Sequence, residues 1–90
     1  MKHIDIRVKG EVQGVFFREE TKKKANSLSL AGFIRNEPDG SVYIEAEGEE
    51  TLLDDLVLWC KEGPQLAKVE DLKFQKSDEL KGFEKFEVRI

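Results

Sequence analysis

The sequence predicts an α+β fold, in which two helices pack on one face of a mostly antiparallel sheet. Three observations indicate it: several short segments alternate apolar and polar residues, two longer segments carry apolar residues at helical spacing, and turns containing glycine or proline separate them. The chain has 90 residues, which is enough for a single domain over residues 1–90 with one two-layer core.

A strand, a loop and a helix are expected at the start of the chain. Ile4, Ile6 and Val8 alternate with polar residues, as in a half-buried strand. A loop with two glycines leads into a helix predicted over residues 18–30, and Gly32 lies near its stop. The apolar positions of this helix fall on one face, at Phe17, Thr21, Ala25 and Leu28.

A hairpin is predicted next. Residues 33–36 form a short strand, and residues 38–40, Pro-Asp-Gly, have the composition of a turn. Residues 42–46 alternate again and give a second half-buried strand, which Gly48 ends.

The second helix begins near Glu49 and Glu50, where the helix dipole favours acidic side chains, and Gly63-Pro64 stops it. Its apolar stripe is Leu52, Leu53, Leu56, Trp59 and Cys60. A further strand covers residues 67–74, but its alternation breaks in the middle, so we expect a bulge near Glu70-Asp71. A polar loop over residues 77–82 precedes a closing strand over residues 86–90.

The order is therefore β-α-β-β-α-β with one extra C-terminal strand, which is the ferredoxin-like arrangement. Because every strand alternates, one face of the sheet should be open to water and the other covered by both helices. This architecture hosts many functions, so the function has to come from a site.

Composition excludes several classes of function. The net charge of −4 argues against nucleic-acid binding, which usually needs a basic surface. No apolar run approaches the roughly 20 residues that span a membrane, and the N-terminus lacks the apolar core of a secretory signal. The single cysteine, Cys60, fits a reducing compartment, so we expect a cytoplasmic protein. No His, Cys or Asp cluster has metal-ligand spacing, and we expect no metal and no cofactor.

The loop between the first strand and the first helix has the features of an anion site. It reads Gly-Glu-Val-Gln-Gly-Val-Phe-Phe-Arg over residues 10–18. Such a loop aims backbone N–H groups at one point, and the helix N-terminus adds positive potential. Gly14 permits close approach, and the guanidinium of Arg18 can make bidentate bonds to phosphoryl oxygens. Read by itself, this loop could equally be a tight turn with Arg18 in solvent.

Asn36 is the second candidate. The Pro-Asp-Gly turn does not need it, so its carboxamide is free to point into the site from a strand end. A carboxamide can accept a hydrogen bond from water while donating another, and it can thereby orient a nucleophile without acting as a base.

These residues also carry a resemblance to a known family. Residues 10–18 resemble the first signature of the acylphosphatases, and residues 32–36 (Gly-Phe-Ile-Arg-Asn), with residues 39–42 and Gly48, resemble the second. Order, spacing and chain length agree with the family. Ile34 stands where the family more often has Val or Ala, and Phe16 where many bacterial members have Gly; neither position supplies chemistry.

The resemblance implies a metal-free hydrolase that cleaves the carboxyl-phosphate bond of small acyl phosphates, and we expect it to act as a monomer. It implies that Arg18 and Asn36 are catalytic, with Asn36 holding the attacking water. It also implies a phosphate-binding loop made of Glu11, Val12, Gln13, Gly14, Val15, Phe16, Phe17 and Arg18.

Two alternatives remain open. One is a non-catalytic module that binds an anion or carbamoyl phosphate, like the acylphosphatase-like domain of hydrogenase-maturation proteins. The other is a ferredoxin-like RNA-binding protein, which the acidic charge and the position of Phe16-Phe17 disfavour. Cys60 is expected in the core and not as a nucleophile, because no arginine stands six residues after it. His3 is expected at the surface.

Overall fold

The computed structural model describes residues 1–90 as five strands and two helices. In chain order they are β1 (Lys2–Glu11), α1 (Phe17–Ser27), β2 (Ala31–Asn36), β3 (Val42–Gly48), α2 (Glu50–Glu62), β4 (Lys68–Ser77) and β5 (Phe86–Arg89). Neither helix has the length and apolar character that crossing a bilayer requires.

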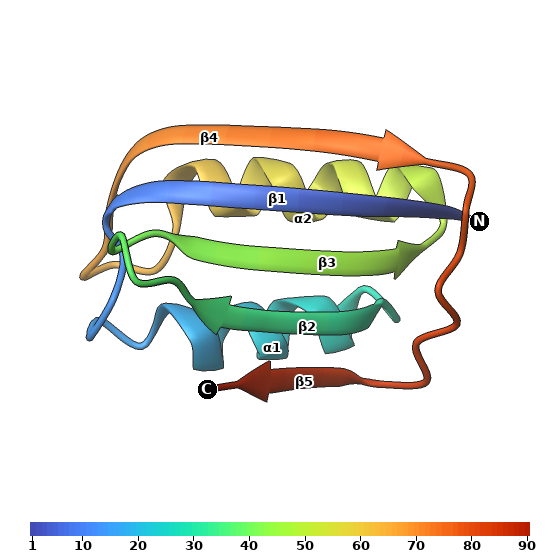
Figure 1. Cartoon of the computed structure of the whole chain (residues 1–90), viewed down its shortest axis with the longest axis horizontal. Helices are drawn as coiled ribbons and strands as arrows, with labels where there is room; N and C mark the ends of the chain where they lie inside the picture. The colour runs from blue at the N-terminus through green and yellow to red at the C-terminus, as the bar shows by residue number, and fades with distance from the viewer.

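The five strands form one sheet in the order β4-β1-β3-β2-β5. All neighbours are antiparallel except β2 and β5, which run parallel. Both helices lie behind the sheet as Figure 1 views it, so the other face is free of helices. The predicted α+β ferredoxin-like fold with an extra C-terminal strand is therefore confirmed.

The core lies between the sheet and the helices. Ile4, Ile6 and Val8 of β1 are completely buried, as their alternation predicts. The predicted face of α1 is confirmed at Phe17, Thr21 and Ala25, and α2 buries Leu53, Leu56, Val57 and Cys60. Because β1 is an interior strand of the sheet and is anchored by this core, the loop that follows it starts from a fixed point.

The first helix ends earlier than residue 30, and Gly32 is not its stop. Ser29 takes the left-handed conformation (φ 56°) just after α1, and Gly32 lies inside β2. A Cβ built on Gly32 would lie 1.9 Å from the carbonyl oxygen of Glu45, so glycine is required there by the close approach of β3.

The predicted bulge in the fourth strand is confirmed. The pairing of β1 with β4 passes from Lys9–Asp71 to Gly10–Val69, which leaves Glu70 as the extra residue. Gly10 has φ 130°, and a Cβ on it would lie 2.1 Å from the carbonyl oxygen of Lys68. The bulge thus bends the strand pair just before the glycine-containing loop begins.

One part of the open face differs from the prediction. His3 was expected at the surface, and Glu45 and Glu47 alternate with the buried residues of β3 on the face expected to be open to water, but all three are buried. The imidazole Nδ1 of His3 lies 2.6 Å from Glu47 Oε2, and the Glu47 carboxylate accepts hydrogen bonds from the backbone N–H groups of Lys81 and Gly82. The segment between β4 and β5 therefore covers this end of the sheet and buries a polar network.

Candidate active site

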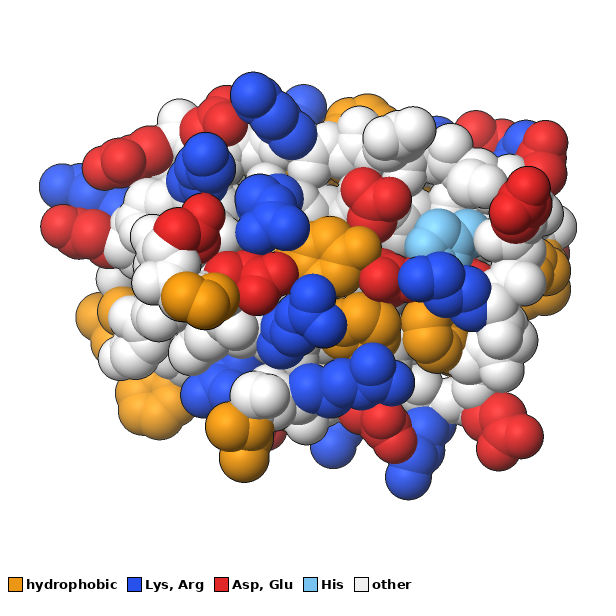
Figure 2. All heavy atoms as spheres, in the orientation of Figure 1, with side chains coloured by type: hydrophobic (Ala, Val, Ile, Leu, Met, Phe, Trp, Pro, Cys, Tyr) orange, Lys and Arg blue, Asp and Glu red, His pale blue; other side chains and the backbone are white.

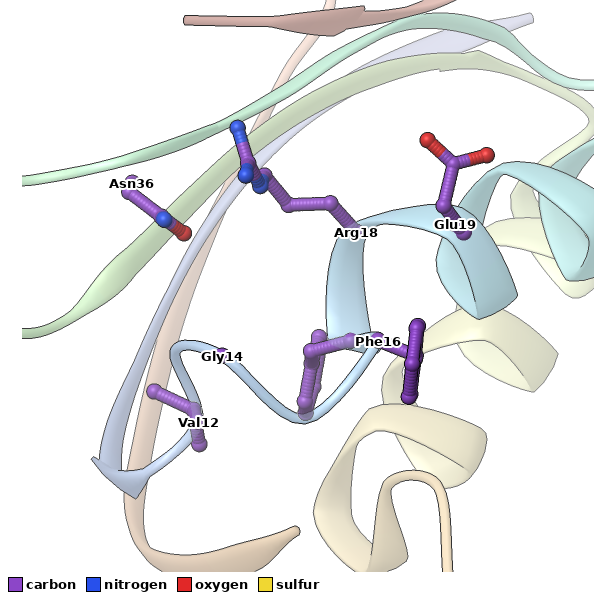
Figure 3. Close-up of a pocket in the computed structure, with 7 residues that line it drawn as sticks. Val12, Gly14, Phe16, Arg18, Glu19 and Asn36 are labelled. Atoms are coloured by element: carbon purple, nitrogen blue, oxygen red, sulfur yellow. The ribbon is translucent and has the colours of Figure 1, made fainter. Parts of the chain in front are cut away.

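A pocket of about 230 Å³ lies where β1, α1 and β2 meet. Its lining comes from the loop after β1, the first turn of α1 and the last residue of β2 (Figure 3). The lining residues are Val12, Gly14, Phe16, Phe17, Arg18, Glu19 and Asn36. The topology brings these segments together because β1 and β2 are both neighbours of β3.

The loop carries a series of unpaired backbone donors. None of the N–H groups of residues 13–16 donates to a protein acceptor, and the first bond of α1 runs from Glu20 N–H to Phe16 O at 3.0 Å. The first N–H groups of the helix likewise have no intrahelical acceptor. A run of free donors ending at a helix N-terminus favours an anion, with phosphate as the best match.

Two left-handed residues shape this loop. Gly14 has φ 72°, and a Cβ built on it would meet no atom within 4 Å, so it would project into open space. Phe16 has φ 64°, which is costly for an aromatic residue, and its side chain is 69% exposed. The loop therefore holds a strained conformation and an unburied aromatic ring at the edge of the pocket.

Arg18 reaches from the first turn of α1 toward β2 (Figure 3). Its Nη1 donates to the backbone carbonyl oxygen of Arg89 in β5 at 3.3 Å. This single bond fixes the direction of the guanidinium and leaves its other N–H donors free for a ligand. The extra C-terminal strand thus has a part in the site, because it holds Arg18 at the pocket.

Asn36 projects from the end of β2 toward the loop (Figure 3). Its Oδ1 is buried and accepts no hydrogen bond from the protein. A buried acceptor without a partner costs free energy, on the order of 1–3 kcal/mol, unless a water or ligand satisfies it. The structure thus leaves an acceptor in the pocket wall that suits a water molecule.

Gln13 joins the loop to the hairpin that follows Asn36. Its side-chain Nε2 donates to the carbonyl oxygens of Glu37 and Ser41, both at 2.9 Å. Asp39 Oδ1 accepts from the backbone N–H and the hydroxyl of Ser41, at 2.9 and 2.6 Å, and closes the predicted turn. The hydrogen bond from the Ser41 hydroxyl, followed by the one from the Ser41 backbone N–H, holds the pKa of Asp39 below its usual value.

Three residues of the predicted phosphate-binding loop lie outside the lining of the pocket. Glu11 is exposed and pairs with Lys68 in the sheet, Gln13 turns toward the hairpin, and Val15 lines a neighbouring groove. Phe17 lines the pocket, but its ring is buried against Trp59 at 5.9 Å between ring centroids. Glu19 lines the pocket and was not predicted; its place in the first helical turn was the available signal.

Other reactive side chains lie apart from the pocket. Cys60 is completely buried in the core, and burial raises the pKa of its thiol to about 12. This agrees with its predicted place in the core. Among residues 1–90 no group of three or more His, Cys, Asp or Glu side chains could hold a metal ion.

The open face of the sheet does not offer a stacking platform for bases. The guanidiniums of Arg7 and Arg35 lie 5.1 and 5.0 Å from the ring centroid of Tyr43 and cover it. Figure 2 shows basic and acidic side chains interspersed over this face. This face therefore does not present the exposed aromatic surface and basic field that RNA-recognition modules use.

Fold and site together define an α+β domain with a pocket of free backbone N–H donors at a strand–loop–helix junction. The family model described as Acylphosphatase matches residues 4–88. This chain therefore belongs to the acylphosphatase family, as its two sequence signatures predicted.

Individual relatives agree with this assignment. An acylphosphatase of Rubrobacter xylanophilus is 44% identical over 88 residues, which cover 98% of this chain and 80% of the relative. The crystal structure of acylphosphatase from Bacillus subtilis has a TM-score of 0.97 at 38% identity and covers both chains completely. The structure of full-length HypF, in a phosphate- and nucleotide-bound form, has a TM-score of 0.86 at 26% identity; the match covers 98% of this chain and 12% of that one.

Proposed function

We propose that this protein hydrolyses acyl phosphates to a carboxylate and inorganic phosphate, without a metal ion. The observation that carries the proposal is the run of free backbone donors at the start of α1, with Arg18 on one side and the unpartnered Oδ1 of Asn36 on another. The family assignment supports the same reaction.

The phosphoryl group would lie in the loop, where backbone N–H groups and the Arg18 guanidinium meet its oxygens. Charge on those oxygens is what phosphoryl transfer must stabilise, and fixed donors do so without rearrangement. Gly14 permits this approach, since no Cβ fills the space beside its backbone.

Asn36 would hold the attacking water through Oδ1, in line with the bond to the leaving carboxylate. The water's oxygen bonds to phosphorus and the P–O bond to the acyl group breaks. A dianionic acyl phosphate and water thus give a carboxylate and dihydrogen phosphate. The water's proton passes to a phosphoryl oxygen, and no side chain acts as a base.

The test is turnover of acetyl phosphate and benzoyl phosphate in excess chelator. We expect release of one phosphate per acyl group cleaved, with competitive inhibition by inorganic phosphate. Activity that vanishes with chelator and returns with Mg²⁺ or Zn²⁺ would overturn the metal-free mechanism. Phosphate binding without any turnover would instead make the chain an anion-binding module. The structural similarity to HypF, which was solved in a phosphate- and nucleotide-bound form, is the reason to test this alternative.

We further infer that the protein acts as a monomeric single domain in the cytoplasm. All of the proposed site residues come from one chain, and the only cysteine is buried as a free thiol. Sedimentation at micromolar concentration with and without phosphate tests the oligomeric state; a dimer that alone is active would contradict it.

A further inference from the structure

A second concavity adjoins the proposed phosphate pocket. This groove, of about 500 Å³, lies between the start of α1 and the segment that follows α2. Its lining residues are Val15, Phe16, Glu20, Trp59, Gly63, Pro64, Gln65 and Leu66. Half of them are hydrophobic, and Leu66 is 67% exposed.

Phe16 belongs to the lining of both the pocket and the groove. Its left-handed backbone places a largely exposed ring at their boundary instead of in the core. Backbone strain of this kind is kept where the surrounding structure uses it. A ligand that occupies the pocket can therefore extend past Phe16 into the groove without leaving the protein surface.

The direction of the reaction indicates what occupies the groove. Displacement at phosphorus needs the incoming water and the leaving carboxylate on opposite sides of the phosphoryl group. In Figure 3 Asn36 lies above and to the left of Gly14, at the end of β2, and Phe16 lies to the right of Gly14, where the loop enters α1. With the water held at Asn36, the leaving group points toward Phe16 and the groove beyond it.

We propose that this groove binds the acyl group of the substrate, and that the chain therefore favours acyl phosphates with an apolar, uncharged acyl group such as benzoyl. The proposal rests on the acyl phosphate hydrolysis proposed above. Apolar walls at Trp59, Pro64 and Leu66 would cover an aromatic ring and remove it from water. The lining holds one carboxylate, Glu20, and no cation, so an acyl group that carries its own negative charge is disfavoured.

The decisive experiment compares acetyl phosphate with benzoyl phosphate in variants of Leu66, which lies outside the proposed phosphate-binding loop. For Leu66→Ala, kcat/KM for benzoyl phosphate should fall roughly three- to tenfold, because part of an apolar wall is lost. For Leu66→Asp the fall should be larger. Acetyl phosphate, which does not reach the groove, should be cleaved as by the unmodified protein. Leu58→Ala removes a comparably exposed leucine of α2 outside the groove and should change neither substrate.

Binding of non-hydrolysable ligands separates this proposal from the function on which it rests. Phenacylphosphonate and acetonylphosphonate carry the two acyl groups on a methylene phosphonate, and calorimetry measures their affinities without turnover. Leu66→Asp should weaken phenacylphosphonate alone. If Leu66→Asp leaves both the ratio of the two phosphonate affinities and the ratio of the two kcat/KM values unchanged, the proposal that the groove binds the acyl group is overturned. Failure to cleave either substrate, with both phosphonates still bound, would overturn the hydrolysis.

Discussion

The side-chain amide of Gln13 donates a hydrogen bond to the backbone carbonyl oxygen of Ser41, at 2.9 Å. A second bond from the same nitrogen reaches Glu37 O, also at 2.9 Å. These two carbonyl groups belong to the turn between β2 and β3, which begins directly after Asn36. Gln13 therefore sets the distance between the two halves of the proposed site, the phosphate loop and the residue that would hold water.

Replacing Gln13 by Ala should lower kcat more than it weakens phosphate binding. Without the two bonds the hairpin can shift relative to the loop, and a displacement of about 1 Å in a positioning element can cost on the order of 100-fold in rate. We expect kcat for acetyl phosphate to fall at least about tenfold, with the phosphate inhibition constant within about threefold. Gln75→Ala on β4 serves as the control. If kcat and phosphate affinity fall by the same factor, Gln13 supports binding of the phosphoryl group in the ground state instead.

Replacing Arg18 by Ala should weaken phosphate binding and lower turnover together. Charge-assisted hydrogen bonds contribute about 1.5–3 kcal/mol each, so the inhibition constant should rise at least about tenfold. Arg18→Lys should recover only part of this, because the lysine ammonium lacks the planar fork of donors with which arginine can bond Arg89 O and two phosphoryl oxygens at once. Calorimetry with inorganic phosphate measures the affinity. An unaltered affinity in Arg18→Ala would place the anion site elsewhere.

Gly14→Ala should weaken both the fold and the site, for separable reasons. The positive φ of 72° should cost about 1 kcal/mol of stability for a residue with a Cβ, and that Cβ would project into the space proposed for the phosphoryl group. Gly82→Ala is a matched control, because Gly82 has φ 81° and equally open surroundings but lies far from the pocket. Both variants should lose similar stability in urea melts, and only Gly14→Ala should lose phosphate affinity. If Gly14→Ala loses stability but keeps its phosphate affinity, Gly14 does not belong to the phosphate site.

The buried network at His3 should make the fold sensitive to acid. Burial acts to raise the pKa of Glu47, but hydrogen bonds from Lys81 N–H, from His3 and from Gly82 N–H outweigh it and hold the pKa below its usual value. The folded pKa therefore lies below the unfolded one. The resulting stability is complete above the unfolded value of about 4.3 and is lost as the pH falls through the folded pKa.

Glu47→Gln should remove part of this dependence. We expect a loss of about 1–3 kcal/mol in the free energy of unfolding near pH 7, and a flatter decline between about pH 5 and pH 2. Urea melts across this range measure both quantities. Glu87→Gln, on the edge strand β5, changes a half-exposed carboxylate outside this network and is the control. The same acid sensitivity in Glu47→Gln and the unmodified protein would assign the effect to other carboxylates.

The sequence predicted those parts of the structure that depend on local pattern. The alternation at Ile4, Ile6 and Val8, the helical face of α1 and the Pro-Asp-Gly turn each follow from neighbours within a few residues. Even the bulge at Glu70 was visible, because a strand buried on one face has to keep its phase. Arg18 and Asn36 were proposed as site residues from their residue types, from their positions at element ends and from the resemblance to the two acylphosphatase signatures.

Contacts between segments that are distant in the chain could not be predicted from the sequence. The burial of His3 and Glu47 depends on the segment between β4 and β5, which alternation within a single strand does not reveal. The bond from Arg18 to Arg89 joins residues 71 positions apart. The pattern of the loop alone is compatible with a Gln13 side chain that faces the ligand. The structure shows that this side chain donates to the backbone of the hairpin instead.

Asn36→Ala separates the proposed water-holding role from binding and from folding. The Asn36 side chain is neutral, and its Oδ1 has no protein partner, so its removal breaks no internal bond at that atom. The turn after it is closed by Asp39 and Ser41, so the fold and its melting temperature should be retained.

If Oδ1 only orients the attacking water, the loss in Asn36→Ala should appear in kcat, because the transition state alone needs the water in line. Removing a comparable polar positioning group costs about 10²–10³ in kcat. The phosphate inhibition constant should stay within about threefold. Asn26→Ala, at an exposed position of α1, should behave as the unmodified protein. A preserved kcat with a much higher inhibition constant would make Asn36 a binding residue, and a collapsed melt would make it a structural one.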